Sequence, residues 1–343
     1  MNPSLFPIES YWWFYLAFSG FVVLVLAVDL GLFHREHKVV SFREATTWSL
    51  VWIALALVFN FLLYQYCLWH FASDPRLNAV AGFNPALAAK RVALEFLAGY
   101  VVEESLSMDN IFVFVLIFRY FAIPAAYQHR ILFLGILGAI VFRGIFISIG
   151  AALIQYHWVV VVFGLFLVIT GVKMLFAGDE QLDPSENPLV RLLSRYLPFS
   201  PAIHGPQFLV QLNGVRHATP LLITLACIET TDVLFAIDSV PAVFALTREP
   251  LIVFSSNIFA ILGLRSMYFM LASAIDRFHL LKYGLSLVLI FVGVKMLGVG
   301  EWLGAEPSIG VSLGIIGLIL GVSIGLSLAF PAKVVPPPEP SSD

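Results

Sequence analysis

The feature that most constrains this chain is a series of long apolar runs. Each holds about 20 residues or more, which is the length that an α-helix needs to cross the hydrocarbon core of a bilayer. Nine such runs fall at approximately 11–33, 45–67, 90–118, 128–151, 156–177, 217–245, 251–275, 281–299 and 308–330. The sequence therefore predicts an all-α, polytopic transmembrane bundle of about nine helices, forming a single membrane domain over residues 1–343.

Composition supports this class and excludes others. Hydrophobic residues make up 60% of the chain and charged residues only 12%, about half the charged fraction of a soluble domain. The sequence has no stripe of basic residues of the kind that binds nucleic acid, so a nucleic-acid partner is not expected. The expected surrounding is membrane lipid. The two cysteines, Cys67 and Cys227, lack the spacing of a metal or redox motif. The first apolar run is too long for a cleavable signal peptide.

Basic residues between the runs predict the orientation. Eleven lysines and arginines lie in the segments that follow odd-numbered runs, which all fall on one side of the membrane. Only four lie on the other side. The larger set is Arg35, Lys38, Arg43, Arg119, Arg130, Arg191, Arg195, Arg216, Arg277, Lys282 and Lys333, and the smaller is Arg76, Lys90, Arg91 and Arg248. Because positive charge marks the cytoplasmic side, we expect the N-terminus outside and the C-terminus inside.

Two segments fall outside the apolar runs. Residues 178–216 form the one sizeable cytoplasmic loop, in which 189–197 could be an amphipathic surface helix or a plain linker. Residues 331–343 are rich in proline and serine, and we expect a disordered cytoplasmic tail.

A five-residue motif occurs twice. Gly171-Val-Lys-Met-Leu recurs as Gly293-Val-Lys-Met-Leu, 122 residues later, and Arg143 and Arg265 share that offset. Acidic motifs recur as well, with Glu103 six residues before Asp109 and Asp232 six residues before Asp238.

These matches indicate two three-helix repeats, 90–177 and 217–299. Because three is odd, the second copy enters the membrane from the opposite side, and such inverted repeats are typical of transporters. The alternative is an old duplication that is retained only for packing.

Carboxylates within the runs point to a cation. A charge near the bilayer centre costs several kcal/mol and requires a counter-charge. The candidate ligands, all oxygen donors, are Glu103, Asp109, Asn110, Glu229, Asp232, Asp238 and Asp29. For Asp109, Asp232 and Asp238 the structural alternative is a salt bridge to Arg143, Arg265, Lys173 or Lys295, and a basic side chain could also replace the cation during transport.

Neighbouring polar residues leave further alternatives open. Ser107, Thr230 and Ser239 either face the ion or bond back to helix carbonyls. Asp238 lies six residues beyond Asp232 and needs reorientation to join it, for which Pro241 could supply a kink or break.

The ligand chemistry narrows the choice of ion. Oxygen-rich sites suit Mg²⁺, Ca²⁺ and Mn²⁺. Softer ligands are absent from the centres of the predicted spans, because all eight histidines lie near span ends or in loops. The sequence therefore argues against a dedicated zinc or copper site.

The acidic motifs resemble those of the TerC/Alx family of bacterial integral membrane proteins. The matching stretches are Gly99 to Phe114, with Glu103-Glu-Ser-Leu-Ser-Met-Asp109-Asn110, and Glu229-Thr-Thr-Asp232 to Asp238-Ser239-Val-Pro241. Asp29-Leu-Gly31 is similar to the family's first helix, and the resemblance extends over about Val28 to Leu297. At Glu104 the family pattern often has a lysine, so this chain adds a negative charge.

The resemblance implies a manganese exporter of the cytoplasmic membrane. The family name comes from tellurite-resistance operons, but an acidic site should repel an oxyanion. We expect no enzyme activity and no resident cofactor, with Mn²⁺ as cargo, a proton as a plausible counter-ion and an oligomeric state that the sequence does not set. The alternatives are export of Ca²⁺ or another divalent cation, and a membrane scaffold that supplies metal to secreted proteins or organises a stress complex.

Overall fold

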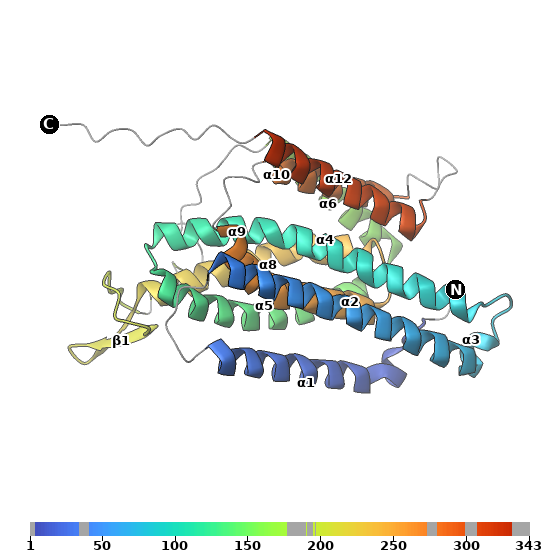
Figure 1. The fold of residues 1–343 in the computed structure, drawn as a ribbon, viewed down its shortest axis with the longest axis horizontal. Coiled ribbons are helices and arrows are strands. Elements are labelled where there is room, and N and C mark those ends of the chain that lie inside the picture. The colour runs from blue at the N-terminus through green and yellow to red at the C-terminus, as the bar shows by residue number, and fades with distance from the viewer. Residues whose placement is uncertain are drawn as a thin grey trace.

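Nine long helices run back and forth along one axis in the part of the chain that the computed structural model describes (Figure 1). The described residues are 4–33, 41–176, 190, 195, 197–272, 280–298 and 307–330. The long helices are α1 (Ile8–Phe33), α2 (Phe42–Ser73), α4 (Pro85–Tyr120), α5 (Ala125–Leu153), α6 (His157–Phe176), α8 (Pro220–Phe244), α9 (Pro250–Ala272), α10 (Leu281–Met296) and α12 (Ile309–Ala329). The expected all-α bundle is confirmed, and seven of these helices are long and apolar enough to span a membrane.

The helix ends follow from capping residues and prolines. Ser41 caps α2 by accepting from the Glu44 amide, and Asn84 caps α4 by accepting from the Leu87 amide. Pro85 and Pro220 stand in the first turns of α4 and α8, where no amide hydrogen is needed. These residues place the starts of α2 and α4 at Phe42 and Pro85, before the predicted starts at 45 and 90.

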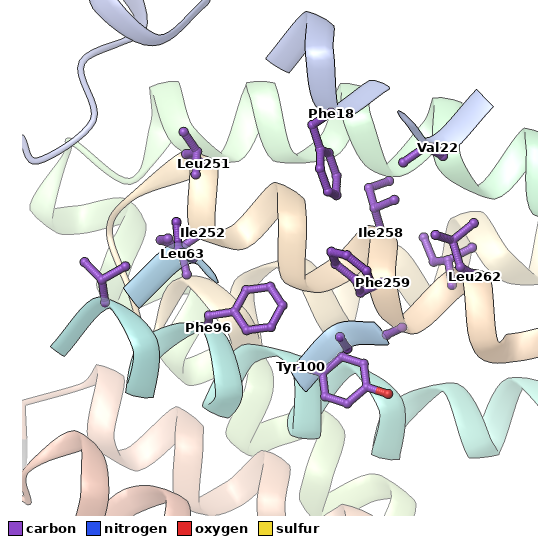
Figure 2. Close-up of a cluster of buried hydrophobic side chains, with 14 of the residues drawn as sticks. Phe18, Val22, Leu63, Phe96, Tyr100, Leu251, Ile252, Ile258, Phe259 and Leu262 are labelled. Carbon is purple, nitrogen blue, oxygen red and sulfur yellow. The ribbon is translucent and has the colours of Figure 1, made fainter. Parts of the chain in front are cut away.

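Helix α9 forms the centre of the bundle. In its most apolar window 94% of residues are buried, against 22% in α1. It packs against α2, α4 and α5, while α1 lies along the outside. Figure 2 shows Phe259 of α9 between Phe18 of α1 and Phe96 of α4. The outward faces of α1, α2 and α12 are apolar and exposed, as a surface in contact with lipid must be.

Helices α6 and α10 form a close antiparallel pair. A β-carbon added to Gly171 would lie 2.8 Å from the Ser286 carbonyl oxygen, and one added to Gly293 would lie 2.7 Å from the Gly164 carbonyl oxygen. The two contacts are equivalent, because Ser286 stands 122 residues after Gly164, as Gly293 does after Gly171. This pairing is what an inverted repeat requires of its third helices, and inversion of all three helices stays a prediction.

A polar network ties the N-terminal segment to the turn between α8 and α9. The Leu5 amide donates to Glu249 Oε1 at 2.9 Å, and the Glu249 amide donates to the Thr247 hydroxyl at 3.2 Å. Thr247 in turn donates to Glu95 Oε2 at 2.6 Å, and Arg91 donates to Oε1 of the same carboxylate at 2.7 Å. The network therefore joins α4, the α8–α9 turn and the N-terminus at one end of the bundle.

The short helix α3 (Pro75–Asn78) lies at the same end of the bundle and is capped by Asp74. Burial works against ionisation of Asp74, but hydrogen bonds from the Arg76 side chain and backbone outweigh it and lower the pKa of this carboxyl. Arg76 Nη2 lies 2.7 Å from Asp74 Oδ2.

One feature was not predicted. Strands β1 (Leu209–Leu212) and β2 (Val215–Ala218) form an antiparallel hairpin just before α8. Its turn is Asn213-Gly214, with both residues at positive φ (50° and 80°), which is the pattern of a type I′ turn. The predicted amphipathic segment 189–197 and the tail 331–343 lie largely or wholly outside the described residues.

Candidate functional site

Three charged side chains meet near the middle of α4, α5 and α8. Arg143 of α5 forms ion pairs with Glu103 of α4 and Asp232 of α8, with its Nη2 lying 3.6 Å from Asp232 Oδ1. All three side chains are buried, with exposed fractions of 1%, 0% and 2% respectively. Two carboxylates thus share one guanidinium, which leaves the cluster one negative charge in excess.

Two asparagines hydrogen-bond to the charged side chains of this cluster. Arg143 Nη1 donates to Asn257 Oδ1 of α9 at 3.1 Å, and Asn110 Nδ2 donates to Asp232 Oδ1 at 3.4 Å. Asn257 is itself oriented by a bond from its Nδ2 to the Val253 carbonyl at 3.0 Å. Both asparagines are buried. The cluster therefore joins α4, α5, α8 and α9.

A small cavity of about 50 Å³ adjoins this cluster. Its lining includes five polar or charged residues and one methionine, from four helices: Asn110, Arg143, Thr170, Asp238, Ser239 and Met174. A volume of this size has room for a few water-sized groups. Thr170 of α6 and Asp238 of α8 both line the cavity, and the two helices are in contact. A carboxylate, an amide, hydroxyls and a thioether all border the same space.

Two further glutamates, Glu229 and Glu104, lie next to glycines of neighbouring helices, where the glycine has no side chain to fill the space. The Glu229 carboxylate of α8 fills the space that a side chain at Gly138 of α5 would take. Glu104 turns away from Glu103, and its Oε1 would lie 3.5 Å from a β-carbon on Gly263 of α9. The adjacent glutamates of α4 therefore serve different interfaces, and only Glu103 joins the arginine cluster.

Several buried polar atoms of the described residues have no hydrogen-bond partner. They are Glu103 Oε2, Asp232 Oδ2, Glu229 Oε2, Ser107 Oγ, Ser239 Oγ and Arg143 Nε, among others. An unsatisfied buried polar atom costs about 1–3 kcal/mol, so a concentration of them marks a place for water or an ion. Carboxylate and hydroxyl oxygens are ligands that Mn²⁺ and Ca²⁺ accept.

The structure places the predicted ligands in three groups. Glu103, Asp232 and Asn110 contact one cluster, Asp238 lines the adjoining cavity, and Glu229 lies beside Gly138. The side chains of Asp109 and Asp29 lie outside the described set. Among the described side chains no three His, Cys, Asp or Glu residues are close enough together to hold a metal.

The structure also bears on the alternatives left open for the neighbouring hydroxyl groups, for Pro241 and for the two repeated lysines. Thr230 bonds back to the Ala226 carbonyl at 2.7 Å, whereas Ser107 and Ser239 have no such partner. Helix α8 continues through Pro241 to Phe244, so Asp238 reaches the cavity without a break in the helix. Lys173 and Lys295 lie toward opposite ends of the antiparallel α6–α10 pair.

Thr170 and Met174 were missed by sequence reasoning. They come from α6, which carries no acidic motif, although Met174 belongs to the repeated Gly-Val-Lys-Met-Leu segment. Thr170 and Met174 are four residues apart and share a helix face. That spacing, together with the repeat, is the signal that could have drawn attention to them.

These observations define a multi-pass helical membrane protein with a buried cluster of charges between its helices. The sequence profile of the integral membrane protein TerC family matches residues 88–334. The chain therefore belongs to the TerC family, and the family expected from the acidic motifs is confirmed.

Individual relatives extend the match over most of the chain. An uncharacterised membrane protein of Myxococcus xanthus, STKORF319, is 48% identical over 91% of this chain and 90% of its own. A protein of Escherichia coli (strain K12) with the provisional name membrane-bound redox modulator Alx is 44% identical over 88% of this chain and 90% of its own. An uncharacterised membrane protein of Rickettsia bellii is 35% identical over 90% of this chain and 95% of its own. No solved structure matches the chain.

Proposed function

We propose that this protein exports a divalent cation, Mn²⁺ in the first place, from the cytoplasm across the bacterial cytoplasmic membrane. The observation that carries the proposal is the buried cluster in which Glu103 and Asp232 share Arg143. Charged groups inside a membrane protein are costly and mark ion pathways. The protein moves its cargo unchanged, so neither enzyme chemistry nor a resident cofactor is part of the proposal.

Charge balance explains how the site works. With Arg143 in place, two carboxylates and one guanidinium sum to −1. A divalent cation in place of the guanidinium would neutralise both carboxylates. Arg143 is therefore a tethered substitute for the cation in the ion-free state, and its contact with Asn257 offers it a polar partner on α9 when the ion enters.

A proton can compensate for the ion when it leaves. Carboxylates that lose their cation in a low-dielectric surrounding favour the protonated form. Glu229 and Asp238 lie on α8, outside the arginine contact, and are the candidates for proton uptake. Exchange of protons for metal would make export depend on the proton gradient.

The name of the Escherichia coli relative contains a redox role. In this protein such a role would be an indirect result of metal export. Cys67 and Cys227 are both free thiols and buried in separate apolar clusters, on α2 and α8. They do not form a cysteine pair that could exchange electrons as a disulfide.

Uptake by inverted membrane vesicles tests the proposal. Vesicles that contain the protein should accumulate Mn²⁺ faster than vesicles without it, and Ca²⁺, Mg²⁺ and Zn²⁺ are added in turn as competitors. Stronger competition by Ca²⁺ than by unlabelled Mn²⁺ would identify a calcium exporter instead. Binding of Mn²⁺ without accumulation would refute export and favour the scaffold.

A further inference from the structure

We propose that Met174 supplies a thioether ligand to the cation in the cavity and thereby makes the carrier selective for transition-metal ions over Ca²⁺ and Mg²⁺. This inference rests on the proposed transport function. It assigns to α6 a part in ion selection that neither the acidic motifs nor the names of the relatives contain.

The position of Met174 follows from the face of α6 on which it lies. Thr170 stands one turn earlier on α6, and residues at i and i+4 share a helix face. Thr170 and Met174 both line the cavity that Asp238 of α8 borders, so this face of α6 forms part of the cavity wall. Met174 is half-buried there and lines the cavity together with Asp238 and Asn110.

The chemistry of the lining supports selection by ligand softness. The carboxylate of Asp238, the amide of Asn110 and the hydroxyls of Thr170 and Ser239 are hard oxygen donors, which suit Ca²⁺ and Mg²⁺ as well as Mn²⁺. Arg143 also lines the cavity, and its guanidinium is the group that the cation replaces in the proposed function. Thioether sulfur is a soft donor with little affinity for Ca²⁺ or Mg²⁺. One sulfur among oxygens therefore favours the transition metal without creating a dedicated zinc or copper site.

Packing is the alternative role for a methionine, because its flexible side chain fills irregular gaps. The repeat offers a matched control for this alternative. Met296 holds the equivalent position in the second Gly-Val-Lys-Met-Leu segment, on α10. It packs against apolar clusters and is not one of the described residues that line the cavity.

The experiment compares Met174→Leu with Met296→Leu in the purified full-length protein, using Mn²⁺, Cd²⁺ and Ca²⁺ as probes. Leucine keeps the volume of methionine and removes the sulfur. For Met174→Leu we expect Cd²⁺ affinity to fall about tenfold, as loss of an ordinary metal-site contact does, with a smaller fall for Mn²⁺ and none for Ca²⁺. Met296→Leu should leave the three affinities unchanged, and equal thermal unfolding of both variants shows that they fold.

The cadmium NMR signal of the bound ion supplies a second readout. It should carry the chemical shift of a sulfur ligand in the wild type and in Met296→Leu, and lose it in Met174→Leu. Unchanged affinity ratios and an unchanged cadmium signal in Met174→Leu would overturn the inference. Failure of export is separate, because vesicles with wild-type protein would then accumulate no Mn²⁺ whatever the binding data show.

Discussion

Replacement of Arg143 by methionine should produce a protein that depends on its cation for stability. The substitution keeps a long side chain but removes the one guanidinium that Glu103 and Asp232 share. Removing one partner of a buried ion pair costs about 3–5 kcal/mol, because the remaining charge is left uncompensated. We therefore expect a clear fall in unfolding temperature in the presence of a chelator.

Mn²⁺ should reverse this loss. A ligand at 100 times its dissociation constant stabilises the folded state by about 2.7 kcal/mol, and at 1,000 times by about 4.1 kcal/mol, which is close to the loss of about 3–5 kcal/mol. In the wild type the same ion must first displace Arg143, so its stabilising effect should be smaller. The expected signature is a larger Mn²⁺-induced rise in unfolding temperature for the variant than for the wild type.

The assay is thermal unfolding in detergent, followed by tryptophan fluorescence, with chelator and with Mn²⁺. Arg119→Met is the matched control, since Arg119 is exposed in the last turn of α4. If Arg143→Met is as stable as the wild type without metal, the guanidinium does not compensate the carboxylates. If it is destabilised and Mn²⁺ does not restore it, the cluster is structural and the substitute-cation explanation is wrong.

Three further predictions test the helix contacts around the site and the orientation of the chain in the membrane. Gly138→Ala should displace the Glu229 carboxylate and lower Mn²⁺ transport about tenfold, whereas Gly20→Ala, where a β-carbon meets nothing within 4 Å, should leave transport rates unchanged. Gly171→Ala and Gly293→Ala should each cost about 1–3 kcal/mol in the free energy of unfolding, because both β-carbons would meet backbone atoms of the partner helix, and a large effect at one position alone would contradict their equivalence. A reporter fused after residue 333 should report the cytoplasm and one placed near residue 76 the outside, and both on one side would refute the predicted orientation.

The helices were predictable because their signals are local. Apolar length predicted the spans. Residues such as Ser41, Asn84 and Pro220 set the observed helix ends but did not enter the prediction. The hairpin at Leu209–Ala218 was missed although its Asn213-Gly214 turn is a strong short-range signal. It was missed because the whole segment between the spans was treated as a loop.

The composition of the site was predictable only in part, because it depends on how helices face each other. The acidic motifs identified Glu103, Asp232 and Asp238 from the cost of charge in a membrane. Arg143 was one of four basic residues named as possible salt-bridge partners, and its ion pair with Asp232 agrees with that alternative. That Arg143 would also pair with Glu103 depends on how α5 packs against α4 and α8, which no local pattern encodes. Thr170 and Met174 were not predicted for the same reason, since they line the cavity where α6 packs against α8.

The most direct test of cation export through this site is Mn²⁺ transport in Asp238→Asn, measured beside thermal stability. The substitution keeps the size of the side chain and removes the one carboxylate that lines the cavity among the described residues. We expect Mn²⁺ uptake by inverted vesicles to fall sharply while the unfolding temperature stays close to that of the wild type. The sequence predicts the same for Asp109→Asn. Wild-type transport rates in both variants would contradict a role for these carboxylates in carrying the ion.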